Sequence, residues 1–121
     1  EAVSLLAYSP LGQGYLSGKY EGNALPPNSR KALFGRMGRY EMGNGPTAIS
    51  TYVALARKHG LDPAQMALGF VTSRPFVTSN IIGATTLAQL KTDIEGGLLK
   101  LSDAVLKDIE ETHLIYPNPC P

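Results

Sequence analysis

The chain has 121 residues, of which 43% are hydrophobic and 17% are charged. No apolar run approaches the roughly 18 residues that a membrane-spanning helix needs, so we expect no membrane segment. The formal net charge is only +1 and acidic and basic residues are interspersed, which argues against a nucleic-acid partner and makes any anion site a local feature. The single cysteine, Cys120, excludes a disulfide framework and a cysteine-based metal site, and it fits a reducing, cytoplasmic location.

The first predicted element is a short strand over Val3 to Tyr8 (VSLLAY), which is nearly all apolar and is closed by Ser-Pro and glycine. Such a run is typical of a strand that is buried on both faces of a parallel sheet. The chain begins with Glu1 rather than Met and has no signal-peptide pattern. We therefore expect a fragment or a processed piece of a longer protein.

A Gly-rich turn follows this strand, SPLGQGYLSGKY over residues 9–20, and it ends near Lys19. A glycine turn that follows a strand and carries a cation suggests a phosphate site. The next stretch, Glu21 to Pro46, is polar, rich in Gly and Pro, and has no sustained period. Because long loops in compact domains are usually lids or binding loops, we expect residues 21–46 to cover a ligand.

Two helices are expected next. Thr47 to His59 places apolar residues at helical spacing and is stopped by Gly60. The second helix begins after Asp62 as N-cap, has Pro63 at its first position, and runs to about Ser73.

A second strand is predicted over Phe76 to Ala84, followed at once by a Gly-bearing turn and a helix over Leu87 to Glu95. A last helix over Ser102 to His113 opens on a capping serine. Two strands joined by a helical crossover must be parallel, and two apolar parallel strands cannot cover their own faces. The sequence therefore predicts a piece of a larger α/β protein, with the missing strands supplied by upstream residues or by other copies of the chain.

Three phosphate-binding patterns compete for the first turn. A Walker A loop needs four residues between a glycine and the Gly-Lys pair and then Ser or Thr, but three residues separate Gly14 from Gly18 and Tyr20 follows the lysine. The GxGxxG fingerprint needs a glycine where Ser17 stands. The third pattern pairs this turn with GATTLAQL, because the loops after the last two strands of a (β/α)8 barrel commonly hold phosphate.

Four motifs occur in order over roughly Val3 to Tyr116: LLAYSPLGQGYLSGKY, LPPNSR, HGLDPAQMALGFV and IIGATTLAQLKTDI. Together they resemble the C-terminal third of an NADP(H)-dependent aldo-keto reductase, in the branch that includes bacterial reductases and potassium-channel β-subunits. The resemblance implies an α/β chain that forms one partial domain over residues 1–121. This domain would supply about strands 7 and 8, with their helices, of a (β/α)8 TIM barrel.

The resemblance also implies which residues hold NADP(H) at the C-terminal ends of the strands. Tyr8 resembles the aromatic residue that stacks on the nicotinamide, Lys19 the pyrophosphate cation, and Arg30 the arginine near the adenosine phosphate. The first turn adds Ser9, Pro10, Leu11, Gly12 and Gln13. The second turn adds Gly83, Thr85, Gln89 and Asp93 at the adenosine end, where Thr92-Asp93 replaces the Glu-Asn that is common in the family.

The family's catalytic aspartate, tyrosine, lysine and histidine lie on earlier strands. We therefore expect no catalytic residue and no metal site in this chain, and no activity from the chain alone. The parent protein is expected to reduce an aldehyde or ketone, its small-molecule carbonyl substrate, by hydride transfer. Two alternatives stay open: a non-catalytic nucleotide-sensing or interaction subunit with the same fold, and a truncated chain that associates with copies of itself through open strand edges.

Overall fold

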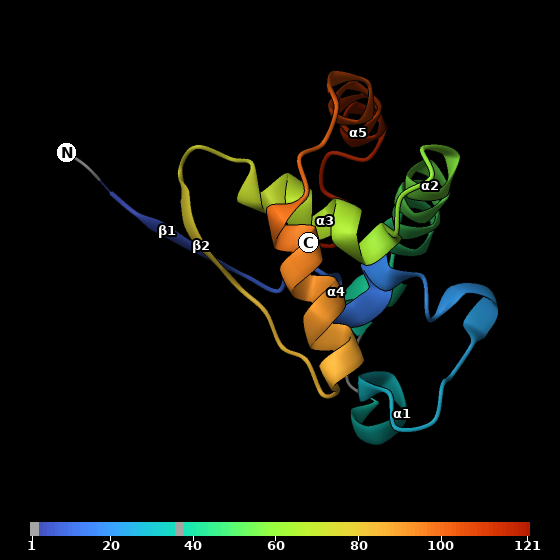
Figure 1. Ribbon diagram of the computed structural model, residues 1–121. Helices are drawn as coiled ribbons and strands as arrows, with labels where there is room; N and C mark the ends of the chain where they lie inside the picture. Colours follow the sequence, from blue (N-terminus) through green and yellow to red (C-terminus); the bar gives the residue numbers. More distant parts are fainter. Residues whose placement is uncertain (1–2, 36–37) are drawn as a thin grey trace.

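The two strands form a parallel pair at one side of the molecule (Figure 1). In this computed structural model, which describes residues 3–35 and 38–121, β1 spans Leu5–Tyr8 and β2 spans Val77–Ile81. The last residues of the strands, Tyr8 and Ile81, are register partners. The predicted parallel direction is therefore confirmed, although both strands are shorter than expected.

Four longer helices lie to one side of the strand pair (Figure 1). They are α2 (Gly45–Lys58), α3 (Pro63–Thr72), α4 (Leu87–Leu98) and α5 (Asp103–Ile115). All four were predicted, with ends that differ by a few residues. The largest difference lies in α4, which continues beyond Glu95 through two glycines because the first of them, Gly96, packs closely against α3.

Local capping explains where these helices begin and end. The side chain of Asp62 accepts a hydrogen bond from Gln65 N at 3.0 Å, and Ser102 caps α5 in the same way. After α2, Gly60 adopts a left-handed φ of +68°, and Leu61 N donates to Ala56 O at 2.9 Å. This is the glycine-terminated helix end that the sequence predicts.

The segment predicted as an irregular loop, residues 21–46, contains more regular structure than expected. It holds the 3₁₀ turns η2 (Glu21–Asn23) and η3 (Gly38–Glu41), the short helix α1 (Arg30–Phe34), and the first two residues of α2. Residues 36 and 37 of this segment lie outside the described part of the chain. The expectation of irregular structure is wrong for α1, whose five residues are too few to produce a hydrophobic period but are capped by Ser29.

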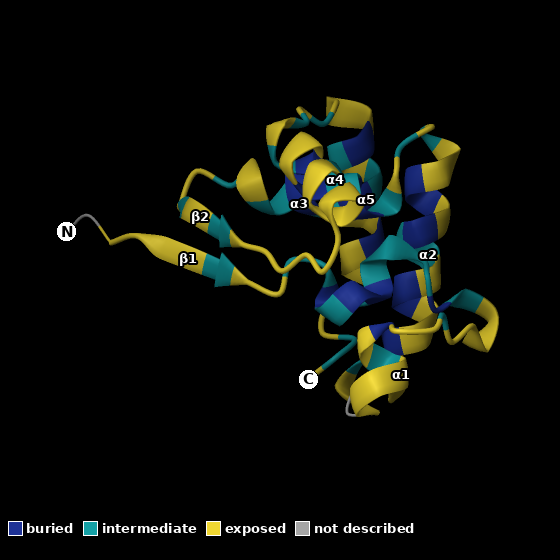
Figure 2. Cartoon of the chain, turned by 60° about the horizontal axis from the view of Figure 1, so that its bottom comes forward, coloured by how far each residue is buried: buried dark blue, intermediate teal, exposed yellow. Residues whose placement is uncertain are grey.

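The core lies on two sides of α2. One cluster joins α2 to the turn after β1, which includes the 3₁₀ segment η1 (Gly12–Ser17), through Tyr15, Tyr20, Ile49 and Val53. The other joins α2 to α3 and α5 through Leu55, Ala56, Met66, Val105 and Ile109. Figure 2 shows that buried positions are concentrated in the helical part of the molecule.

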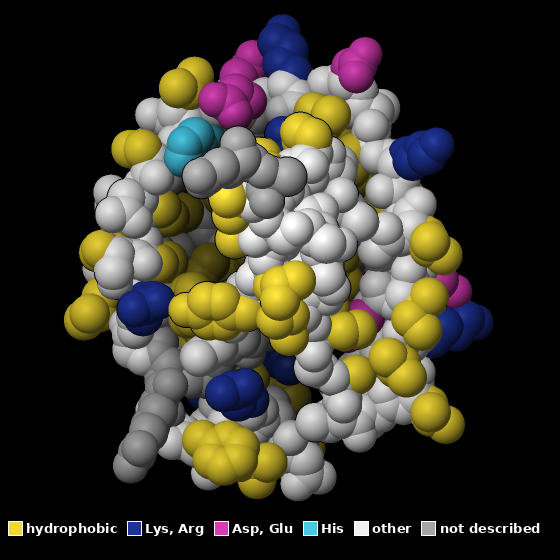
Figure 3. All heavy atoms as spheres, turned by 90° about the vertical axis from the view of Figure 1, so that its left-hand side faces the viewer, with side chains coloured by type: hydrophobic (Ala, Val, Ile, Leu, Met, Phe, Trp, Pro, Cys, Tyr) yellow, Lys and Arg dark blue, Asp and Glu magenta, His cyan; other side chains and the backbone are white. Residues whose placement is uncertain are grey.

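The strands, in contrast, are largely exposed (Figure 2). Leu6 is 58% exposed and Tyr8 is 75% exposed, and Figure 3 shows hydrophobic side chains on the face where the strands lie. The expectation that both faces are buried is therefore wrong for this chain by itself. Among residues 3–35 and 38–121, no helix has both the length and the apolar character needed to cross a membrane.

Candidate functional site

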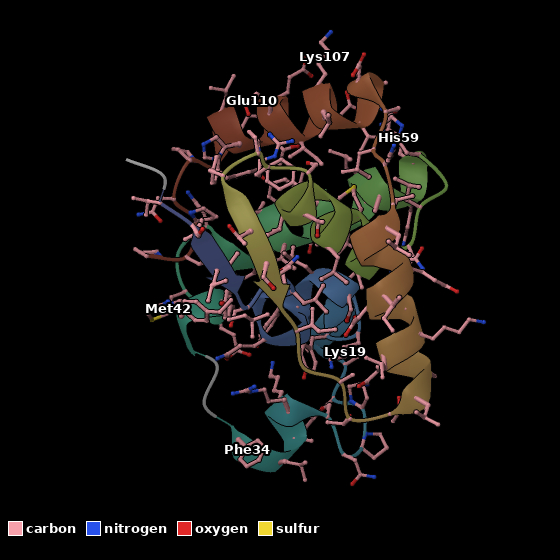
Figure 4. All side chains as sticks on the ribbon, turned by 60° about the vertical axis from the view of Figure 1, so that its left-hand side comes forward. Lys19, Phe34, Met42, His59, Lys107 and Glu110 are labelled. Carbon is pink, nitrogen blue, oxygen red and sulfur yellow. The ribbon has the colours of Figure 1, made fainter. Side chains whose placement is uncertain are left out.

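A hollow of about 710 Å³ lies where the two strands end. Because the strands are parallel, their carboxyl ends meet at the same edge of the sheet, and the turns that follow them form two of its walls. The short helix α1, the beginning of α3 and residues 88–93 of α4 complete it. Figure 4 shows Lys19 above α1, which carries Phe34.

Almost all of the predicted cofactor residues line this hollow. They are Tyr8, Ser9, Pro10, Leu11, Gln13, Lys19, Arg30, Gly83, Thr85, Gln89 and Asp93. Gly12 is the exception, because it is buried behind the wall, where a Cβ would lie 3.3 Å from the ring of Tyr40. Its position fits a role in the turn and in packing.

The first turn has an unusual backbone. Ser9 and Gln13 both have φ near +57°, in the left-handed region that side chains other than glycine rarely adopt. The turn is closed by Gly12 N, which donates to Ser9 O at 2.9 Å, and by Gly14 N, which donates to Leu11 O at 3.0 Å. Backbone strain of this kind clusters at binding sites, where it is held by the surrounding structure.

Lys19 lies folded against the same turn. A Cβ at Gly14 would lie 2.7 Å from Lys19 Cε, and the ammonium lies 5.2 Å from the centre of the Tyr20 ring. The φ of +98° at position 14 favours glycine, and the absence of a side chain there lets the end of Lys19 lie against the turn. Within the described ranges, neither Lys19 nor Arg30 forms an ion pair with a carboxylate.

Thr85 of the second turn is hydrogen-bonded to Gln89 in the first turn of α4. Gln89 Oε1 accepts from both Thr85 N and Thr85 Oγ1 at 2.9 Å, and Thr86 caps α4 by accepting from Gln89 N at 3.2 Å. The Gln89 oxygen is thus occupied, while its amide nitrogen donates to no acceptor among the described residues. The turn is held in shape by its own side chains.

Two carboxylates line the hollow where α3 and α4 meet. Asp93 is only 5% exposed, and Asp62 begins α3 beside it. Burial, and then the charge of Asp62, raise the pKa of the Asp93 carboxyl above its usual range. The hollow therefore has cations from the first turn and α1, and acidic groups at the junction of α3 and α4.

Sequence reasoning missed several wall residues, most clearly Leu33 and Phe34 of α1. They follow Arg30 by three and four residues, so one face of this helix presents all three to the hollow. The capping serine at position 29 was the available signal. Within the described part of the chain, no group of three or more His, Cys, Asp or Glu side chains is placed to hold a metal ion.

Comparison with known proteins shows which family this sequence matches. The sequence model of the aldo/keto reductase family matches residues 1–113. The protein tas of Escherichia coli is 53% identical over 121 residues, which cover all of this chain and 35% of that protein. An aldo-keto reductase of Babesia bovis is 30% identical over 122 residues, which cover 97% of this chain and 43% of that protein. A probable voltage-gated potassium channel subunit beta of Arabidopsis thaliana is 32% identical over 114 residues, with 90% of this chain and 35% of that protein covered. The chain thus spans less than half the length of these relatives.

Proposed function

This chain belongs to the aldo/keto reductase family, and we propose that it forms the dinucleotide-binding part of an NADP(H)-dependent oxidoreductase that reduces aldehydes or ketones. In this proposal β1 and β2 are about strands 7 and 8 of a (β/α)8 barrel. The observation that carries it is the convergence of two cations, Lys19 and Arg30, from separate segments on one hollow at the strand ends. A dinucleotide phosphate is an anion of matching charge.

Three residues of the hollow have specific roles in this proposal. Lys19 and Arg30 bind phosphate oxygens, and the planar guanidinium of Arg30 suits bidentate pairing with a 2′-phosphate. Tyr8, exposed at the end of β1, offers an aromatic face to the nicotinamide ring. The bound nicotinamide supplies the hydride.

No residue of this chain is assigned to the proton transfer. We place the proton donor and its partners in the longer protein, together with the residues that select the carbonyl substrate, so the chain alone is expected to be inactive. A cytoplasmic location and the absence of nucleic-acid and membrane partners remain predictions from composition. The exposed strand pair makes self-association of an isolated chain a further prediction.

A second candidate is a nucleotide-sensing or interaction subunit that binds the cofactor without useful turnover. The similarity to a relative named as a potassium channel subunit favours it. Both candidates require dinucleotide binding, so they differ only in whether the complete protein turns over a carbonyl substrate.

The first experiment is a fluorescence titration with NADPH on the complete natural polypeptide that carries these residues. Lys19→Ala and Arg30→Ala each remove a charge-assisted hydrogen bond of about 1.5–3 kcal/mol, so we expect the Kd to rise by about tenfold or more. Arg30→Ala is expected to weaken NADPH more than NADH. Lys107→Ala, on the exposed surface of α5, is the matched control and should leave the Kd unchanged. Unchanged affinity in both site variants would refute the assignment.

A further inference from the structure

The short helix α1 needs support from outside itself. It has five residues, none of which is buried, and a helix of this length is not stable in water on its own. Yet Arg30, Leu33 and Phe34 all line the hollow from this helix. Something must hold α1 in place for these residues to face a ligand.

The support comes from Lys31, the neighbour of Arg30. Its ammonium forms an ion pair with Glu41 Oε1 of η3, and the same oxygen accepts a hydrogen bond from Tyr15 Oη at 2.5 Å. The backbone N–H of Lys31 donates to Tyr20 Oη at 3.2 Å. One residue of α1 is thus tied to the turn after β1 and to η3.

The two tyrosines give this arrangement a rigid base. Tyr15 and Tyr20 are 7% and 6% exposed, they belong to the core cluster with α2, and their ring centres lie 4.9 Å apart. The ammonium of Lys31 lies 5.7 Å and 5.8 Å from the two ring centres, within reach of cation–π attraction. The position of Lys31 is therefore set by groups that cannot move far.

The charge state of the cluster agrees with its geometry. Hydrogen bonds from Lys31 and then from Tyr15 lower the pKa of Glu41, so the carboxylate stays ionised at neutral pH. Burial, with the bond to Glu41, raises the pKa of Tyr15, so the phenol keeps the proton it donates. Tyr15 and Glu41 are therefore in the states that their hydrogen bond requires.

We propose that Tyr15, Lys31 and Glu41 form a clasp that positions α1 and directs Arg30 into the hollow. Successive residues on a helix point about 100° apart, so fixing the direction of Lys31 fixes that of Arg30. None of the three clasp residues lines the hollow itself. They are positioning residues, and their effect on the ligand passes through Arg30. This inference rests on the proposed function only for its ligand, NADPH.

The test is a double-mutant cycle on the complete natural polypeptide. Glu41→Gln keeps the side-chain shape and removes the charge, and we expect the Kd for NADPH to rise by about fivefold. In the Arg30→Ala background, Glu41→Gln should have a clearly smaller effect, because Arg30 is gone and only Leu33 and Phe34 of α1 are left for the clasp to position. Glu111→Gln, which disrupts an exposed ion pair on α5, is the matched control and should change neither value. A Kd within twofold of wild type for Glu41→Gln, or an equal loss in the Arg30→Ala background, would overturn the proposal.

Hydrogen exchange of residues 29–35 tests the clasp without any nucleotide. We expect faster exchange in α1 for Glu41→Gln and for Tyr15→Phe than for wild type, with Glu111→Gln unchanged. Unchanged exchange in both clasp variants would overturn the proposal even if NADPH binds. If NADPH does not bind at all, the proposed function fails, while this measurement still decides whether the clasp holds α1.

Discussion

Gly96 decides how closely α3 and α4 approach each other. It is buried in α4, and a Cβ built on it would lie 2.9 Å from Gln65 Cα and 3.1 Å from two atoms of the Leu68 side chain. Gln65 Cα belongs to the backbone of α3, so the added methyl group could be accommodated only by moving one helix. The adjacent Gly97 has no atom within 4 Å of its Cβ position, although it lies in the same helix.

Alanine substitutions at these two glycines should change the free energy of unfolding in opposite directions. Alanine is favoured over glycine in a helix by about 1 kcal/mol, somewhat less near the end. At position 96 this gain is opposed by overpacking, which costs about 1–3 kcal/mol and lies at the upper end where backbone must move. We therefore expect Gly96→Ala to lower the free energy of unfolding by about 1–2 kcal/mol, and Gly97→Ala to raise it by about 0.5–1 kcal/mol.

Urea unfolding followed by circular dichroism measures both variants directly. The comparison needs equal m-values, so that the shift in midpoint reports stability and not a change in the unfolded state. If Gly96→Ala stabilises the protein as much as Gly97→Ala does, the helices do not approach each other as described. That result would contradict the close packing of α4 against α3 at Gly96.

Two further predictions concern pH. Burial raises the pKa of Asp93 in the folded state, so its ionised form is disfavoured there. Asp93→Asn should therefore raise the free energy of unfolding at pH 7 and have a much smaller effect at pH 3, where the carboxyl is largely protonated in both states. Equal gains in urea unfolding at the two pH values would contradict this. Asp108 Oδ2 lies 2.9 Å from Lys58 Nζ and 2.8 Å from His59 Nε2. Hydrogen bonds from Lys58 and then from His59 lower the pKa of Asp108 in the folded state. The stability that the Asp108 carboxylate contributes is therefore present above its unfolded pKa and is lost as the pH falls through the lower folded pKa. Asp108→Asn should therefore lower the Tm at pH 7 and lower it by less in strong acid, and an equal decrease at pH 7 and at pH 2 would show that the carboxylate charge is not what links α2 to α5.

Features set by neighbouring residues could be predicted from the sequence. The caps at Asp62, Ser102 and Gly60 depend on side-chain and backbone chemistry within one turn, and all three are confirmed. The parallel direction of the strands followed from the crossover alone. The continuation of α4 through Gly96 could not be predicted, because it depends on contact with α3.

The candidate site also contains residues that the sequence could predict and residues that it could not. Lys19 and Arg30 stood in recognisable motifs, and the structure brings both to one hollow, although their binding of a cofactor stays a prediction. The clasp had no local signal, because Tyr15 and Glu41 are 26 positions apart. Such a contact exists only after the intervening segment has folded back on the first turn.

The pairing of the two strands has a consequence for synthesis of the chain. Leu5 pairs with Val77, so the two turns meet only after the intervening helices have been made. Contacts between residues so distant in sequence form slowly, since loop closure must precede them. A nascent chain that ends before β2 therefore carries one turn and both cations but no opposite wall. The hollow is then a late product of folding, because its last lining residues, in α4, are made only after both turns.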